Sequence, residues 1–185
     1  MLELRTLALV HGHREGRFGA GQPAGRHRTQ PCAVAEIDAQ RCAGRGRPQR
    51  DADVAIEDAQ GRVCFKIILR ELGVEIGLTE LASHPHPVDE KVRMTLEILA
   101  ELFNKFSDQQ VGVSHTGMKY LWTVNRCPFC WHLRVEDPIC LQQVGLLQEA
   151  LYWVSSGKFY SVEEVDCIGK GDKACVIVVD QRPLE

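Results

Sequence analysis

Residues 159–179 read FYSVEEVDCIGKGDKACVIVV. Two runs rich in aromatic and β-branched residues, Phe159–Val165 and Ala174–Val179, predict two strands. They are joined through Gly169–Asp172, whose glycines supply the backbone freedom that a turn requires. The stretch therefore predicts an antiparallel hairpin, and it also carries two cysteines and a glutamate that can bind a metal.

Upstream of the hairpin, the spacing of apolar residues predicts three helices. Pro138 opens a helix that ends near Gly157, with Cys140 in its first turn on the buried face. Two more helices are expected earlier in the chain, over Arg62–Leu72 and over Val88–Phe106. We therefore expect a helix to lie directly before the hairpin and to pack on it.

A further strand is predicted over Met118–Val124, which is rich in aromatic and β-branched residues and runs into Cys127–Cys130. Trp131–Val135 is expected to pair or bend nearby. Helices combined with antiparallel strands predict an α+β fold in which helices pack on one antiparallel sheet. The C-terminal helix and the β-hairpin are expected to carry a zinc site.

A set of soft and hard ligands that suits one structural Zn²⁺ ion lies around the predicted helix, strand and turn: Cys140, Glu164, Cys167 and Cys175. Glu164 and Cys167 are three positions apart, so a regular strand would point them to opposite faces. A bend or bulge at Val165–Asp166 is required to bring both to one ion. The alternative is that the cysteines are small, buried apolar residues.

Cys127 and Cys130 form a Cys-x-x-Cys pair that this ligand set does not use. A redox dithiol is one interpretation, but Pro128 beside a predicted strand favours a bend over the helix start of thioredoxin-type motifs. The other interpretation is a second or alternative metal site. In one such site the pair would bind a metal together with Cys167 and Cys175 and would displace Glu164.

The composition of the chain changes along its length. The first 50 residues carry nine arginines, whereas the first lysine is Lys66. We expect residues 1–52 to be a disordered arm or a leader from a wrongly chosen start codon, and residues 53–185 to form a single domain. The arginines are dispersed and lack interleaved aromatic residues, so nucleic-acid binding is not expected.

The cysteines also bear on the compartment. The chain has eight cysteines at spacings typical of metal sites and no recognisable secretion signal, which predicts a reducing, cytoplasmic location. No apolar run approaches the roughly 18 to 20 residues of a membrane span. A soluble protein is therefore expected.

Aromatic side chains concentrate in the same part of the chain as the thiols: Tyr120, Trp122, Phe129, Trp131, Trp153 and Tyr160. Any one of them is an ordinary core residue. Together they predict an apolar pocket between the helix Pro138–Ser156 and the sheet, able to hold a flat hydrophobic ligand.

The segment from Cys127 to Val179 resembles the 4-vinyl reductase domain. The resemblance rests on Cys-Pro-Phe-Cys at 127–130, on Ile139-Cys140, and on Glu-x-x-Cys at 164–167 followed by a Gly-Asp turn and another cysteine. It implies a fold shared with the sensor domains of phenol-responsive transcription activators and with vesicle-tethering subunits of the transport protein particle. It also implies that zinc is held by the positions that match the sensor ligands: Cys140, Glu164, Cys167 and Cys175.

The resemblance favours a zinc-stabilised domain that binds a small hydrocarbon-like molecule, as a sensor or a carrier, and that pairs as a homodimer. One alternative is a reductase of vinyl groups, for which hydride chemistry would need a cofactor; the chain has no Gly-x-Gly-x-x-Gly fingerprint after a strand. The other is an interaction subunit like the vesicle-tethering relatives. We expect the binding domain rather than an enzyme.

Overall fold

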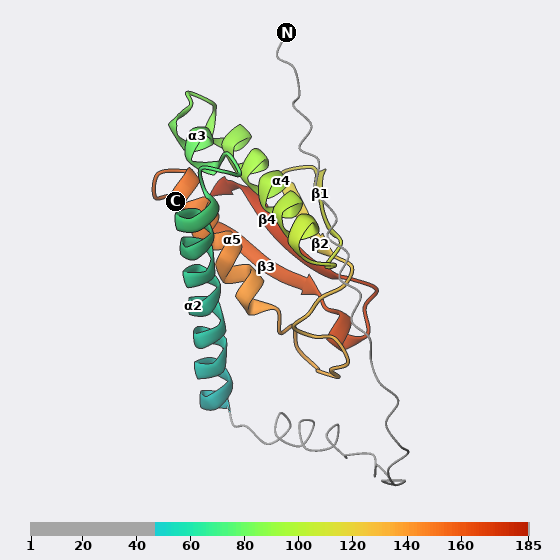
Figure 1. The fold of residues 1–185 in the computed structure, drawn as a ribbon. Helices are drawn as coiled ribbons and strands as arrows, with labels where there is room; N and C mark the ends of the chain where they lie inside the picture. The colour runs from blue at the N-terminus through green and yellow to red at the C-terminus, as the bar shows by residue number, and fades with distance from the viewer. Residues whose placement is uncertain (1–46, 185) are drawn as a thin grey trace, which may run out of the picture. The chain divides into compact units, whose positions relative to one another are not determined.

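The computed structural model describes residues 47–184, and the side chains of residues 55–184. Within these residues, four α-helices pack on a four-stranded antiparallel sheet (Figure 1). The elements in chain order are α2 (Arg47–Leu72), α3 (Leu78–Ser83), α4 (Val88–Phe106), β1 (Val111–Thr116), β2 (Lys119–Val124), α5 (Leu141–Val154), β3 (Tyr160–Asp166), the short 3-10 helix η1 (Ile168–Lys170) and β4 (Cys175–Pro183). The predicted α+β class is confirmed.

The sheet has the strand order β1-β2-β4-β3, and each neighbouring pair is antiparallel. Side chains alternate between two faces along a strand, and one face of the central strands is buried. On that face Trp122 of β2 is paired with Ile177 of β4, and Val124 is paired with Cys175. The helices α4 and α5 contact the sheet, so this face forms the core (Figure 1).

Helix α4 has the predicted bounds, Val88–Phe106, because its sequence carries clear start and stop signals. Pro87 precedes its first residue, and two carboxylates follow in the positively polarised first turn. At the other end, the Phe103 carbonyl accepts hydrogen bonds from the Ser107 hydroxyl at 2.7 Å and from the Ser107 N–H at 2.8 Å. The Asn104 amide then exchanges two hydrogen bonds with the backbone of Val111, which fixes where β1 begins.

Helix α2 packs along α5 through two buried glycines. A methyl group on Gly61 would lie 2.7 Å from the Leu146 nitrogen, and one on Gly145 would lie 2.8 Å from the carbonyl carbon of Asp58. These separations are shorter than van der Waals contact. The two helix backbones therefore touch where they cross, and only glycine fits at either position.

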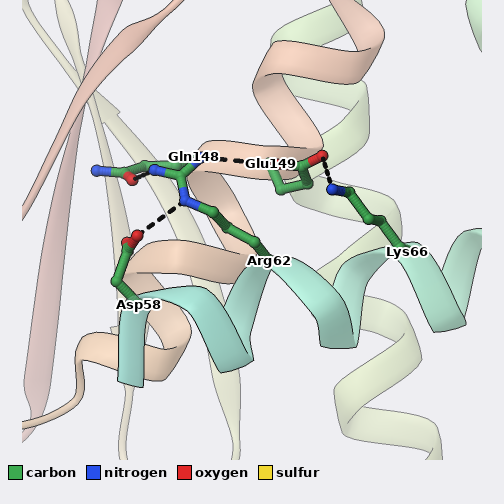
Figure 2. Close-up of polar contacts among 5 residues, drawn as sticks. All are labelled: Asp58, Arg62, Lys66, Gln148 and Glu149. Atoms are coloured by element: carbon green, nitrogen blue, oxygen red, sulfur yellow. Dashed lines mark hydrogen bonds and ion pairs between the residues drawn. The ribbon is translucent and has the colours of Figure 1, made fainter. Parts of the chain in front are cut away.

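Polar and charged side chains join α2 to α5 (Figure 2). The Arg62 guanidinium donates to Asp58 Oδ2 at 2.8 Å, donates to Gln148, and lies 3.6 Å from a Glu149 oxygen. Lys66 reaches the other Glu149 oxygen at 3.2 Å. Each pair is partly solvated and contributes no more than about 1 kcal/mol, so these contacts orient the helices while the glycine contact sets their distance.

Helix α2 differs from its prediction. The predicted stretch Arg62–Leu72 is only its C-terminal part, because the helix begins at Arg47, upstream of the predicted domain boundary between residues 52 and 53. Two apolar residues of the predicted stretch, Val63 and Ile67, are 55% and 47% exposed. The reason is that α2 packs mainly on α5, so one narrow face is covered. The predicted leader, apart from its last residues, lies outside the described part of the chain.

Four other segments also need comment. Strand β1 and helix α3 were not predicted; only the first residue of β1 is buried, so its sequence lacks a clear alternation. The stretch Trp131–Val135 forms no strand and bends in a turn at Trp131–His132, which fits the predicted bend, and the Val135 N–H donates to the Gly169 oxygen at 3.0 Å. Helix α5 begins at Leu141, so Cys140 is its N-cap residue and not part of its first turn.

Among the described helices, none combines the length and the apolar character needed to cross a lipid bilayer.

Candidate metal centre

Six metal-ligating side chains gather where α5 begins, at the turn of the β3–β4 hairpin. All six are buried and none of the five cysteines is in a disulfide. Their ligand atoms form two overlapping sets of four, and within each set all atoms lie within 4.8 Å of one another. One set is Cys140, Glu164, Cys167 and Cys175, and the other is Cys127, Cys130, Cys140 and Cys175.

A bulge in β3 brings two of these ligands to the same side. Glu164 is paired with Ile177 of β4, but Asp166 is paired with the next residue, Val176, so β3 carries one extra residue between them. The extra residue shifts the alternation by one position, and Cys167 is buried like Glu164. The bulge that the spacing required is confirmed.

The hairpin turn is shaped by short polar contacts. The Cys167 N–H donates to Asp172 Oδ2 at 2.9 Å, and the Ile168 N–H donates to Cys175 Sγ at 3.3 Å. Gly171 has a φ of 106°, a conformation that side chains other than glycine rarely adopt. The turn thus places Cys167 and Cys175 on either side of one loop.

The Cys127-Pro128-Phe129-Cys130 segment forms a turn after β2 and does not start a helix. The Cys140 and Cys175 thiols lower the pKa of the Cys127 thiol most, and the backbone of the turn itself lowers it further. The bend predicted from Pro128 is confirmed, and the strand-to-helix geometry of thioredoxin-type dithiols does not form here.

The thiols perturb one another strongly. Hydrogen bonding with the Cys140 thiol, and then with that of Cys175, lowers the pKa of Cys127. The same contact with Cys127 raises the pKa of Cys140, and burial raises the pKa of Cys130 to about 11. Several of these sulfurs cannot be anionic together unless a cation lies among them.

Glu164 gives an independent test of whether a metal fits. Its Oε2 atom accepts a hydrogen bond from the Cys140 N–H at 2.8 Å. Its Oε1 atom is buried and has no hydrogen-bond partner among the described residues. A buried carboxylate oxygen without a partner is costly, and metal ligation would satisfy it.

The sulfur spacing also suits zinc. The Sγ–Sγ distances are 3.2 Å for Cys127–Cys140, 3.3 Å for Cys130–Cys175 and 3.6 Å for Cys140–Cys175. Sulfurs bound tetrahedrally to one zinc ion at about 2.3 Å lie about 3.8 Å apart. The clustered cysteines can therefore hold a metal ion after a small expansion, and zinc bound there would join the start of α5 to the hairpin.

The predicted alternative set included Cys167 beside the Cys127–Cys130 pair. In the structure Cys140 takes the place of Cys167 in that set. The pair therefore shares two partners with the ligand set of the resemblance and does not simply compete for the hairpin cysteines. The spacing of the cysteines in the sequence could not predict these shared ligands, because the sharing depends on how the turn at 127–130 folds against Gly169.

The six aromatic residues of the predicted pocket lie in different environments: Tyr120, Trp122 and Tyr160 are buried, Phe129 and Trp153 are half-buried, and Trp131 is 69% exposed. Trp122 Nε1 donates to Gln143 Oε1 at 3.1 Å, and Trp153 packs on Phe65 of α2. Trp131 stacks on His132. The pocket between α5 and the sheet stays a prediction.

Hollows of the described surface are formed by other residues. One, of about 540 Å³, lies between the end of α4 and the start of β1 and includes Asn104 and Val111. Another, of about 430 Å³, lies on α2 and is lined by Ile56, Ala59, Gln60, Val63, Cys64 and Ile67. Both are open to solvent, so neither is an enclosed ligand pocket.

The chain is similar to known proteins over parts of its length and in its fold. No family model matches the chain. An uncharacterised protein of Methanocaldococcus jannaschii is 39% identical over 57 residues, which are 31% of this chain and 31% of that protein. The matched part thus spans less than a third of that relative.

Three solved structures are similar. One is the trafficking protein particle complex subunit 3 of Naegleria fowleri, covalently bound to palmitic acid, with a TM-score of 0.50 and 17% identity. The match covers 82% of this chain and 90% of that one. The phenol-responsive sensory domain of the transcription activator PoxR, with phenol, has a TM-score of 0.49, 15% identity, and 67% and 63% coverage. A vinyl-4-reductase family protein of M. jannaschii has a TM-score of 0.40, 17% identity, and 64% and 82% coverage.

The structural neighbours are therefore a vinyl-4-reductase family protein, a phenol-sensing domain and a trafficking subunit. These are the three kinds of protein that the sequence resemblance named. At this level of identity the likeness to the Naegleria subunit concerns the fold alone.

Proposed function

We propose that this chain is a zinc-stabilised domain that binds a small hydrophobic or aromatic molecule, as a sensor or a carrier. The observation that carries the metal part is the buried Glu164 oxygen without a partner among the described residues, in one set of ligand atoms with three thiols. The zinc would be held by Cys140, Glu164, Cys167 and Cys175. With four protein ligands it would stabilise the fold and would not activate a water.

The ligand part is supported by the helix–sheet interface. The Naegleria subunit, whose fold is similar, is covalently bound to palmitic acid, an apolar chain. In this chain α4 presents an apolar surface to the sheet, with Val92, Leu96 and Leu99 fully buried. An apolar molecule that displaced some of these contacts would find a similar environment.

Thr95 narrows the class of ligand. It lies on the buried side of α4, next to Val92 and Leu99 at helical spacing, and it is 0% exposed. Its hydroxyl finds no hydrogen-bond partner in the part of the chain that the structure covers. A buried hydroxyl without a partner on an apolar face suits a ligand that is mostly hydrocarbon and carries one polar group, such as a phenol.

The metal assignment predicts the outcome of elemental analysis. The protein, purified under reducing conditions with zinc supplied, is expected to hold zinc, and Cys167→Ser is expected to hold less because serine does not provide a thiolate. Cys64→Ser is the matched control: Cys64 is a half-buried thiol on α2 outside both ligand sets, so its replacement leaves the zinc content unchanged. Purified protein without any metal would refute the assignment.

The ligand assignment predicts a difference between phenol and toluene. Both are expected to raise the melting temperature of the zinc-loaded protein, and phenol more so. Thr95→Val is expected to stabilise the free protein by about 1 kcal/mol, because it removes a buried hydroxyl without a partner. It should also abolish the preference for phenol. If neither compound shifts the melting temperature of the unmodified protein, the ligand proposal fails.

One observation favours the alternative of an interaction subunit. Helix α2 exposes Ile56, Val63 and Ile67 around the apolar hollow described above. An exposed apolar face of this kind is typical of a surface that contacts another protein. The predicted homodimer would have its natural contact here, and it remains a proposal alongside ligand binding.

A further inference from the structure

The two ligand sets are not separate. Cys140 and Cys175 belong to both, and their sulfurs are 3.6 Å apart. The Cys140 sulfur also lies 3.2 Å from Cys127, and the Cys175 sulfur lies 3.3 Å from Cys130. Two sets of four ligands that share two atoms have the form of two tetrahedra joined along one edge.

We propose that the six side chains hold two divalent, thiolate-binding metal ions such as zinc, bridged by the thiolates of Cys140 and Cys175. One ion would also bind Glu164 and Cys167, and the other would also bind Cys127 and Cys130. The inference rests on the metal site proposed above and adds a second ion to it. Each ion has four protein ligands, which is the coordination number that structural zinc prefers.

The charge of the cluster supports two ions. Three thiolates and one carboxylate carry four negative charges, and one divalent ion leaves two of them uncompensated. Five thiolates and one carboxylate carry six, and two divalent ions again leave two. The second ion therefore adds no net charge to a site where all ligands are buried, and it lets Cys127 and Cys130 bind as thiolates.

The backbone at the bridging position is arranged for anionic sulfur. The Ile168 N–H donates to the sulfur of Cys175 at 3.3 Å, and Cys175 belongs to both ligand sets. Hydrogen bonds of this kind are strongest when the acceptor is charged, so both ligand sets have the surroundings of metal-bound thiolates.

The approach of Gly169 to the pair is a second structural sign. A methyl group at Gly169 would lie 2.9 Å from a Val135 methyl carbon and 3.2 Å from the Cys130 Cβ. The absence of a side chain lets the hairpin turn approach the turn at 127–130 closely enough for Cys130 and Cys175 to meet. The pair is thus built into the hairpin site and not merely near it.

The first test counts metal ions per chain, by elemental analysis together with native mass spectrometry of the full chain. Two zinc ions are expected in the unmodified protein and in Cys64→Ser. One is expected in the double variant Cys127→Ser/Cys130→Ser and one in Cys167→Ser. One ion in the unmodified protein that is lost in Cys167→Ser would overturn the two-ion site while leaving the proposed single site intact. Metal-free protein would overturn both.

The second test needs no substitution. Cobalt(II) is titrated into the metal-free protein while its absorption and electron paramagnetic resonance are recorded. Bridging thiolates couple the spins of two cobalt ions, so the resonance is expected to rise up to one ion per chain and to fall as the second binds. A resonance that doubles at two ions would show separate sites, and saturation at one ion would show a single site. Either result would overturn the bridged pair, and acid-labile sulfide in the purified protein would replace it with an iron–sulfur cluster.

Discussion

Replacement of Cys140 with serine is expected to remove all bound metal and to lower the free energy of unfolding by about 4 kcal/mol, the stabilisation given by a ligand present at roughly a thousand times its dissociation constant. Cys140 belongs to both ligand sets, so no set of four survives its loss. Serine is a good residue for the start of a helix, and its backbone N–H can still donate the hydrogen bond to Glu164 Oε2. The loss of stability therefore measures the contribution of the metal and not a change at the start of α5.

Denaturant unfolding with and without a chelator measures this effect. The chelator should destabilise the unmodified protein and the control Cys64→Ser equally, and should leave Cys140→Ser unchanged. A Cys140→Ser protein that kept its zinc, or that responded to the chelator like the unmodified protein, would contradict the metal centre described here.

Replacement of Gly145 with alanine is expected to lower the free energy of unfolding by about 2 to 3 kcal/mol. In an isolated helix the same change would stabilise by about 1 kcal/mol, because alanine has the higher helix propensity. Here the added methyl group would overlap the backbone of Asp58 on α2, which cannot move without separating the two helices. A lowered free energy of unfolding would therefore show that the two helix backbones touch at Gly145, and a raised one would show that they do not.

Gly112→Ala serves as the control for this prediction. Gly112 lies exposed on β1, and a methyl group there would meet nothing within 4 Å. Its replacement is expected to change stability by less than about 0.5 kcal/mol. Gly61→Ala, on the opposite helix of the same contact, should resemble Gly145→Ala. An unchanged or raised unfolding free energy in both glycine variants of the contact would show that α2 and α5 do not touch in solution.

The sequence predicted those elements whose signals are local. Helix α4 has a proline before it and a strong apolar stripe, and its predicted bounds are the observed ones. The hairpin follows from β-branched residues on either side of glycines. By contrast, α2 exposes part of its apolar sequence and packs through glycines, and a glycine contact between helices has no periodic pattern that a sequence can reveal.

For the metal ligands too, local spacing was predictive and contacts between distant segments were not. Spacing alone required a bulge near Val165, and the structure has it. Spacing could not show that Cys127 and Cys130 would share Cys140 with the hairpin, because that sharing depends on the contact between two turns far apart in the sequence. The exposure of Trp131 was equally unpredictable, since an aromatic residue beside a cysteine pair looks like a core residue until the turn is placed.

The bulge in β3 also determines which insertions and deletions the strand tolerates. Deletion of Val165 would remove the extra residue and leave Glu164 and Cys167 two positions apart, on the same face. If one residue were inserted here instead and the bulge stayed, Cys167 would face away from Glu164. The chain would then keep every cysteine and the glutamate and still lose one ligand. When related chains are aligned, the number of residues between this glutamate and the following cysteine is therefore a better indicator of the hairpin site than the number of cysteines.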